Sequence, residues 1–213
     1  MRFKHIFFDL DRTLWDFEIN SHSTLEELFS IFNLKAKGIE RLDDFIRIYK
    51  EHNERLWERY RAGEISQINL RRERFQRTLA DFDIYDFALA EEIGEQYISI
   101  CPKKGQLFPH SIEVLEYLSK KYKLHIITNG FHKVQHVKLK YANLIKYFDT
   151  IVTSEKVGVM KPNPKIFEFA LENANAESSE SVYVGDDLEV YIRPVIGVKQ
   201  KVYIRLITKK NHN

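Results

Sequence analysis

The feature that most restricts the fold is the distance between one short apolar segment and the segments that can pair with it. Residues 3–8 (Phe-Lys-His-Ile-Phe-Phe) have the length and composition of a buried β-strand. The next clear segment of this kind begins at residue 124. A lone strand leaves its backbone N–H and C=O groups unpaired. The chain must therefore return to its first strand from far along the sequence.

The C-terminal half of the chain supplies the missing partners, because helical and extended patterns alternate there. Alternation of this kind implies parallel strands joined by crossover helices. We therefore predict a doubly wound α/β fold with a Rossmann-like parallel sheet. The expected helices span residues 110–121, 131–141 and 164–175, and the expected strands span residues 124–128, 150–153 and 182–184.

The long segment between the first strand and the C-terminal half has the apolar spacing of helices alone. Over residues 21–99 apolar residues recur three and four positions apart, beginning with Leu25 and Leu28, and Ser66 is placed to cap a third helix. Four amphipathic helices in succession indicate a compact helical module inserted in the sheet domain. The predicted domains are an α/β core of residues 1–17 and 101–213 and a four-helix cap of residues 18–100.

Composition limits the classes of partner. The hydrophobic fraction of 44% supports a buried core, and 33 basic against 31 acidic residues give a net charge of only +2. This balance does not call for a nucleic-acid polymer or an anionic membrane as partner. Cys101 is the only cysteine, which excludes an intrachain disulfide. The N-terminal apolar run is too short for a signal peptide or a membrane span, so we expect a cytoplasmic protein; its oligomeric state stays open.

Polar groups follow each expected strand. In open parallel sheets ligands bind beyond the carboxyl ends of the strands, so these groups are expected at one edge. Crowded carboxylates repel one another unless a hard cation lies among them, and oxygen ligands favour Mg²⁺. Carboxylates with a lysine and a threonine suit metal-assisted phosphoryl transfer. The segments are Asp9-Leu10-Asp11-Arg12-Thr13, Thr128-Asn129-Gly130, Lys161-Pro162 and Gly185-Asp186-Asp187.

In this order, the segments resemble the four motifs of the haloacid dehalogenase superfamily. The resemblance covers almost the whole chain, including a helical cap between the first and second motifs. Three further stretches are similar to the pyrimidine 5′-nucleotidase branch of the YjjG type: Trp15-Asp16-Phe17, residues 127–131 and residues 155–162.

The resemblance implies roles for individual residues. Asp9 would be the nucleophile, and Asp11 the general acid and base. Mg²⁺ would be held by the Asp9 carboxylate, the backbone carbonyl of Asp11, and Asp186. The residues expected to bind the phosphate of the substrate are Thr128, Asn129, Gly130 and Lys161.

The expected function is that of a Mg²⁺-dependent phosphatase that hydrolyses small phosphomonoesters through an aspartyl-phosphate. Nucleoside 5′-monophosphates are the favoured substrates, and a sugar phosphate or phosphoglycolate is the alternative. Family members that are true dehalogenases lack the second aspartate, so Asp11 favours the phosphatase.

One position departs from the family pattern. Many relatives have a further aspartate about five residues after the position of Asp186, where this chain has Tyr191. The stretch of residues 191–207 also differs from the small-residue helix that is usual there. This departure is what favours a third possibility, a non-catalytic protein that only binds phosphate ligands.

A basic run in the expected third helix of the cap does not need a functional explanation. Arg71, Arg72, Arg74 and Arg77 are predicted to form a solvated face, because runs of charge usually do.

Overall fold

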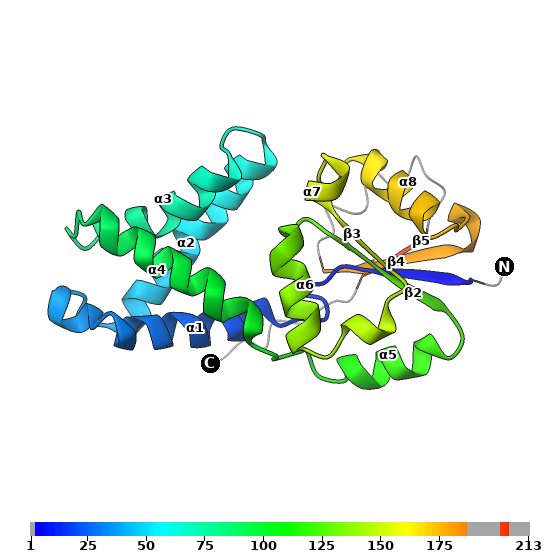
Figure 1. Ribbon diagram of the computed structural model, residues 1–213, viewed down its shortest axis with the longest axis horizontal. Helices are drawn as coiled ribbons and strands as arrows, with labels where there is room; N and C mark the ends of the chain where they lie inside the picture. The colour runs from blue at the N-terminus through cyan, green and yellow to red at the C-terminus, as the bar shows by residue number, and fades with distance from the viewer. Residues whose placement is uncertain (1–2, 187–200, 205–213) are drawn as a thin grey trace. The chain divides into compact units, whose positions relative to one another are not determined.

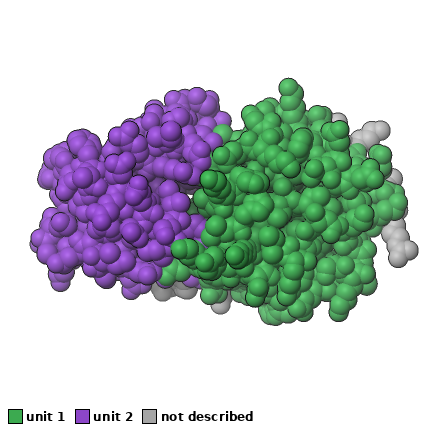
Figure 2. Space-filling model, in the orientation of Figure 1, with its two compact units in different colours: residues 1–17, 103–213 green, residues 18–102 purple. Residues whose placement is uncertain are grey.

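The computed structural model describes residues 3–186 and the backbone of residues 201–204. The predictions that concern Asp187 and Tyr191 lie outside these residues. The chain divides into two compact units, one of residues 1–17 and 103–213 and the other of residues 18–102 (Figure 2). The second unit ends two residues later than the predicted cap. None of the described helices is long and apolar enough to cross a membrane.

The first unit is built on a parallel sheet with the N-terminal strand at its centre. The strand order is β3-β2-β1-β4-β5, and every neighbouring pair is parallel. The predicted α/β class is therefore confirmed, although β5 was not predicted. The strands are β1 (His5–Phe8), β2 (Lys123–Thr128), β3 (Thr150–Thr153), β4 (Ser181–Gly185) and β5 (Lys201–Ile204).

Helices cover both faces of this sheet. Figure 1 shows α8 (Pro164–Asn173) on one face and α5 (Ser111–Ser119) on the other. The backbone N–H of Lys165 donates to the side chain of Asn163, which caps α8, and Pro164 takes a first-turn position that needs no N–H donor. The described part of this unit also contains the α-helices α6 (His132–Tyr141) and the short α7 (Ser154–Val157).

The core beneath α8 joins strands that are distant in sequence. Its strand residues are buried and point to the same side of the sheet, because side chains alternate between the two faces along each strand. They are Phe7, Ile127, Val152 and Tyr183 from four strands, packed against Ile166, Phe167 and Ala170 of α8.

The second unit contains the predicted four helices. The Ser66 hydroxyl accepts a hydrogen bond from the N–H of Asn69, so the predicted cap of the third helix is confirmed. Asp86 caps the fourth helix in the same way, through the N–H of Leu89. The helices are α1 (Phe17–Ile31), which begins one residue before this unit, α2 (Leu42–Arg61), α3 (Gln67–Ala80) and α4 (Phe87–Ile100).

One prediction for the second unit is wrong, because Arg74 does not lie on a solvated face. Its side chain is buried, with the guanidinium carbon 4.6 Å from the centroid of the Tyr97 ring. Arg74 comes four residues after Leu70 and four before Thr78, which are also buried. Its helical position therefore turns it inward whatever its charge.

A buried histidine pair links two strands of the sheet. His125 of β2 is 1% exposed; its Nε2 lies 3.0 Å from Nδ1 of His5, and its Nδ1 lies 2.9 Å from Oγ1 of Thr150. Its ring also stacks on Phe7. Burial lowers the pKa of His125 to about 4, because an imidazolium there would lose its hydration.

This pair makes the stability of the fold sensitive to acid. The folded pKa of about 4 lies below the ordinary 6.5, so the unfolded chain binds more protons between these values. We expect acidification from pH 7 to pH 5 to reduce the free energy of unfolding by roughly 2 kcal/mol more in the parent than in His125→Asn. Urea denaturation at both pH values measures this. The exposed-site variant His110→Asn should follow the parent, and an identical pH response of His125→Asn would contradict the prediction.

Candidate active site

The predicted polar segments meet at the carboxyl edge of the sheet. In the register, Phe8 at the end of β1 lies beside Ile126 of β2 and Val184 of β4. Asp9 and Asp186 directly follow β1 and β4, and Thr128 ends β2. Parallel pairing therefore brings together groups that are more than a hundred residues apart.

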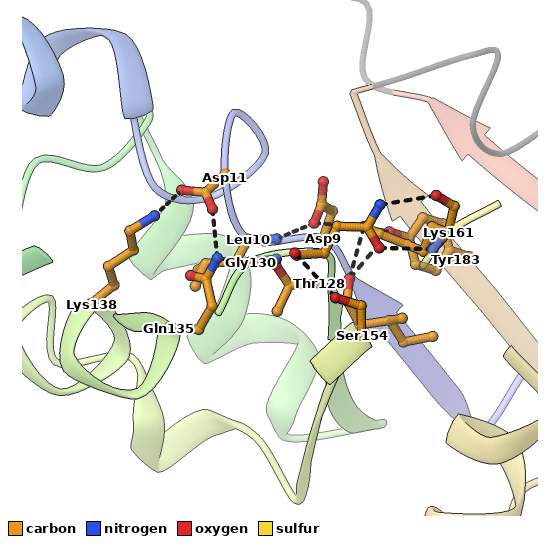
Figure 3. Close-up of polar contacts among 12 residues, drawn as sticks. Asp9, Leu10, Asp11, Thr128, Gly130, Gln135, Lys138, Ser154, Lys161 and Tyr183 are labelled. Atoms are coloured by element: carbon orange, nitrogen blue, oxygen red, sulfur yellow. Dashed lines mark hydrogen bonds and ion pairs between the residues drawn. The ribbon is translucent and has the colours of Figure 1, made fainter. Parts of the chain in front are cut away.

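A tight loop after β1 sets the directions of Asp9 and Asp11. The carbonyl of Leu10 accepts hydrogen bonds from the N–H groups of Leu14 at 3.0 Å and Trp15 at 2.9 Å. The Leu10 side chain is fully buried and anchors the loop. Figure 3 shows the result: the two carboxylates diverge, Asp9 toward Lys161 and Asp11 toward α6.

Asp9 is buried, and one of its carboxylate oxygens accepts two hydrogen bonds. Its Oδ1 accepts hydrogen bonds from the backbone N–H of Leu10 and from Nζ of Lys161, both at 2.8 Å. Lys161 is only 2% exposed and also donates to the carbonyl of Ile127 and the hydroxyl of Tyr183, each at 3.0 Å. The ammonium group is thereby fixed beside the carboxylate.

Asn129 fixes the backbone of Lys161. Its Oδ1 accepts the Lys161 N–H at 2.7 Å, and its Nδ2 donates to the Lys161 carbonyl at 2.9 Å. The Asn129 side chain thus places the loop that carries the lysine. Its expected contact with phosphate stays a prediction.

Thr128 and Gly130 form the second side of the site. The Thr128 hydroxyl oxygen accepts from the N–H of Gly130 at 3.1 Å and from Nε2 of Gln135 at 3.2 Å. A Cβ at Gly130 would lie 1.5 Å from Nε2 of Gln135, so a side chain at this position would displace the Gln135 amide. Both contacts use the Thr128 oxygen as acceptor, so among residues 3–186 its O–H is left to donate to a ligand.

Asp11 is bound by α6 through both oxygens. Nζ of Lys138 lies 2.6 Å from Oδ1, and Nε2 of Gln135 lies 2.7 Å from Oδ2 (Figure 3). Gln135 and Lys138 are both buried. Sequence reasoning missed them, together with Tyr183. One feature of the sequence could have indicated Gln135 and Lys138. They are polar, they lie three residues apart on one face of a predicted helix, and this helix directly follows Thr128-Asn129-Gly130.

Asp186 completes the acidic group. Its burial, followed by the negative charge of Asp9, raises the pKa of Asp186 to about 6. The two carboxylates are thus close enough to repel each other, and a bound cation would remove this repulsion. With the backbone carbonyl of Asp11 they would offer a set of oxygen donors of the kind that suits Mg²⁺.

Comparison with solved structures identifies the fold. The crystal structure of the HAD hydrolase YfnB from Bacillus subtilis, with bound magnesium, superimposes with a TM-score of 0.84 and 23% sequence identity. The match covers 95% of this chain and 88% of YfnB.

Comparison of sequences identifies the family. Pyrimidine 5′-nucleotidase YjjG of Escherichia coli is 35% identical over 190 residues, which cover 89% of this chain and 80% of YjjG. Pyrimidine 5′-nucleotidase PynA of Streptococcus pneumoniae is 26% identical over 195 residues, which cover 91% of this chain and 79% of PynA. The sequence profile of haloacid dehalogenase-like hydrolases matches residues 3–191, and the resemblance inferred from the motifs is confirmed. The chain belongs to the haloacid dehalogenase-like hydrolase family and is a hydrolase.

Proposed function

We propose that this hydrolase is a Mg²⁺-dependent phosphatase that cleaves nucleoside 5′-monophosphates through an aspartyl-phosphate on Asp9. The observation that carries the proposal is the pair of carboxylates on one loop at the carboxyl edge of the sheet. Asp9 lies beside the ammonium group of Lys161, and Asp11 lies two residues further along the chain.

In the first half of the reaction, a carboxylate oxygen of Asp9 attacks phosphorus and the bond from phosphorus to the leaving oxygen breaks. The protonated carboxyl group of Asp11 gives its proton to the leaving oxygen, which departs as an alcohol. Lys161 and the hydroxyl of Thr128 hold the phosphoryl oxygens during this transfer.

In the second half, water attacks the phosphorus of the aspartyl-phosphate. Asp11, now a carboxylate, takes a proton from that water, and the bond between phosphorus and the Asp9 oxygen breaks. Inorganic phosphate leaves, Asp9 is again a carboxylate, and Asp11 is again protonated for the next cycle.

Magnesium, when bound, offsets the negative charge of the phosphate so that an anionic nucleophile can approach it. The residues that would hold it are Asp9, Asp186 and the backbone carbonyl of Asp11. The raised pKa of Asp186, caused first by burial and then by the charge of Asp9, supports this assignment, because a bound cation would stabilise the charged carboxylate.

The nucleotide substrate is supported by the relatives. YjjG and PynA both carry the name pyrimidine 5′-nucleotidase, and each match covers about nine-tenths of this chain. A phosphatase for sugar phosphates or phosphoglycolate is the alternative within the same chemistry.

A panel of phosphate esters tests the proposal. We expect phosphate release from pyrimidine nucleoside 5′-monophosphates to exceed release from purine nucleotides, sugar phosphates and phosphoglycolate. EDTA should abolish activity and Mg²⁺ should restore it. Preference for a sugar phosphate would correct the substrate alone. Absence of phosphate release from every ester would support the non-catalytic alternative, and halide release from L-2-chloropropionate would indicate a dehalogenase.

A further inference from the structure

Two buried polar side chains of α6 lie against the carboxylate of Asp11. We propose that Gln135 and Lys138 are positioning residues that hold Asp11 for proton transfer to the leaving group. This inference rests on the proposed phosphatase function. It assigns a task to two residues outside the four motifs.

The burial of Lys138 is the first observation. Its side chain is 7% exposed, and its ammonium group lies 2.6 Å from Oδ1 of Asp11. The same group lies 4.2 Å from the centroid of the Trp15 ring, which is fully buried. A buried cation requires compensation, and here the carboxylate and the aromatic face supply it. The ammonium group of Lys138 is therefore held between the Asp11 carboxylate and the Trp15 ring.

The orientation of Gln135 is the second observation. Its Nε2 donates to Oδ2 of Asp11 at 2.7 Å and to the Thr128 hydroxyl at 3.2 Å. Its Oε1 is buried and has no hydrogen-bond partner among the described residues. A reversed amide would place that oxygen against the carboxylate and repel it. In the observed orientation, the amide donates to Asp11, while its own oxygen has no hydrogen-bond partner among the described residues.

The place of Gln135 explains what the contact achieves. Its amide donates to both Asp11 and Thr128, the residue expected to bind phosphate. The position of the Asp11 carboxyl group is thereby fixed relative to the expected phosphate site. Gly130 makes room for this link, because a Cβ there would lie 1.5 Å from Nε2 of Gln135. Together, Gln135 and Lys138 hold both oxygens of Asp11, whose side chain is 28% exposed.

Positioning matters most when the leaving group needs a proton. The alkoxide of a nucleoside is a poor leaving group and depends on general acid catalysis, whereas p-nitrophenolate leaves with little help. A small misplacement of a catalytic group can lower the rate up to about 100-fold. Loss of the contacts to Asp11 should therefore affect these two substrates unequally.

The test compares Gln135→Leu and Lys138→Met with the parent on a nucleoside 5′-monophosphate and on p-nitrophenyl phosphate. We expect kcat to fall about 10- to 100-fold on the nucleotide and less than about 3-fold on the aryl ester, with KM nearly unchanged. Lys138→Arg, which keeps the cation, should restore most of the rate. Lys140→Met makes the same change at an exposed position of α6 and should match the parent.

A second comparison separates positioning from packing. In an Asp11→Asn background, the further change Gln135→Leu or Lys138→Met should alter the nucleotide rate less than about 2-fold, because both act through Asp11. Gly130→Ala, which displaces the Gln135 amide, should depress the nucleotide rate more than the aryl rate.

Equal losses on both substrates, or losses that multiply in the Asp11→Asn background, would overturn the inference and leave the phosphatase function standing. A parent protein inactive on both esters with Mg²⁺ would instead reject the proposed function, and the inference with it. Thermal unfolding of each variant identifies any that fails to fold. If Gln135→Leu or Lys138→Met does not fold, the inference is tested by the ratio of nucleotide to aryl rates in Gly130→Ala and Lys138→Arg.

Discussion

Replacing Asp9 with asparagine is expected to lower kcat by about 10⁴-fold or more, since removal of a nucleophile eliminates the covalent route. The amide has the same shape as the carboxylate. Its oxygen can still accept the hydrogen bonds from Leu10 and Lys161 that Oδ1 accepts in the parent. The change therefore removes the attacking charge and keeps the geometry. Steady-state turnover and circular dichroism measure the two effects separately.

The same substitution at Asp149 provides the control. Asp149 is exposed and directly precedes β3, at the edge of the sheet opposite to Asp9. Asp149→Asn should keep the parent's activity. In acid-quenched reactions, mass spectrometry should detect a phosphorylated peptide containing Asp9 in the parent and none in Asp9→Asn. Ordinary turnover by Asp9→Asn would rule out the proposed nucleophile.

Replacing Lys161 with methionine is expected to affect both activity and stability. The ammonium group lies 2.8 Å from Oδ1 of Asp9, and the side chains of Lys161 and Asp9 are 2% and 10% exposed. Removing one partner of a buried ion pair leaves an uncompensated charge and typically destabilises by about 3–5 kcal/mol. Loss of a preorganised donor to the phosphoryl oxygens should lower kcat by about 10²- to 10³-fold. Urea denaturation and steady-state kinetics measure these changes.

Tyr183→Phe separates the ion pair between Lys161 and Asp9 from the other hydrogen bonds of Lys161. The Tyr183 hydroxyl accepts a hydrogen bond from the ammonium group of Lys161 at 3.0 Å, and loss of one hydrogen bond to a charged group changes stability by about 1.5–3 kcal/mol. This variant should retain most of its activity. A loss as large as that of Lys161→Met would contradict the electrostatic role. Inorganic phosphate should raise the unfolding temperature of the parent and of Tyr183→Phe, but not that of Lys161→Met.

The sequence determined the fold class because its signals were local and periodic. The alternation of strands and helices after residue 102 indicated the parallel sheet, and the apolar run of residues 3–8 required that sheet as its partner. The parallel register then placed Asp9, Thr128 and Asp186 at one edge, since strands of this kind end together. The family motifs added the expected roles.

β5 lay beyond the reach of such patterns. Only Val202, Tyr203 and Ile204 form its apolar run, and so short a run shows no clear period. Arg74 was misplaced for a related reason. Its charge was read as a mark of the surface, whereas its helical position between Leu70 and Thr78 decided its burial.

The connections inside the site were decided only by the tertiary structure. The sequence separates Asp11 from Lys138 by 127 residues and Asp9 from Lys161 by 152, and no local pattern links such positions. The Asn129 side chain, whose expected contact with phosphate stays a prediction, binds the backbone of Lys161. Periodicity reports which face of an element is buried, because that depends on neighbours along the chain. Which polar group meets which carboxylate depends on the packing of elements that only the folded chain brings together.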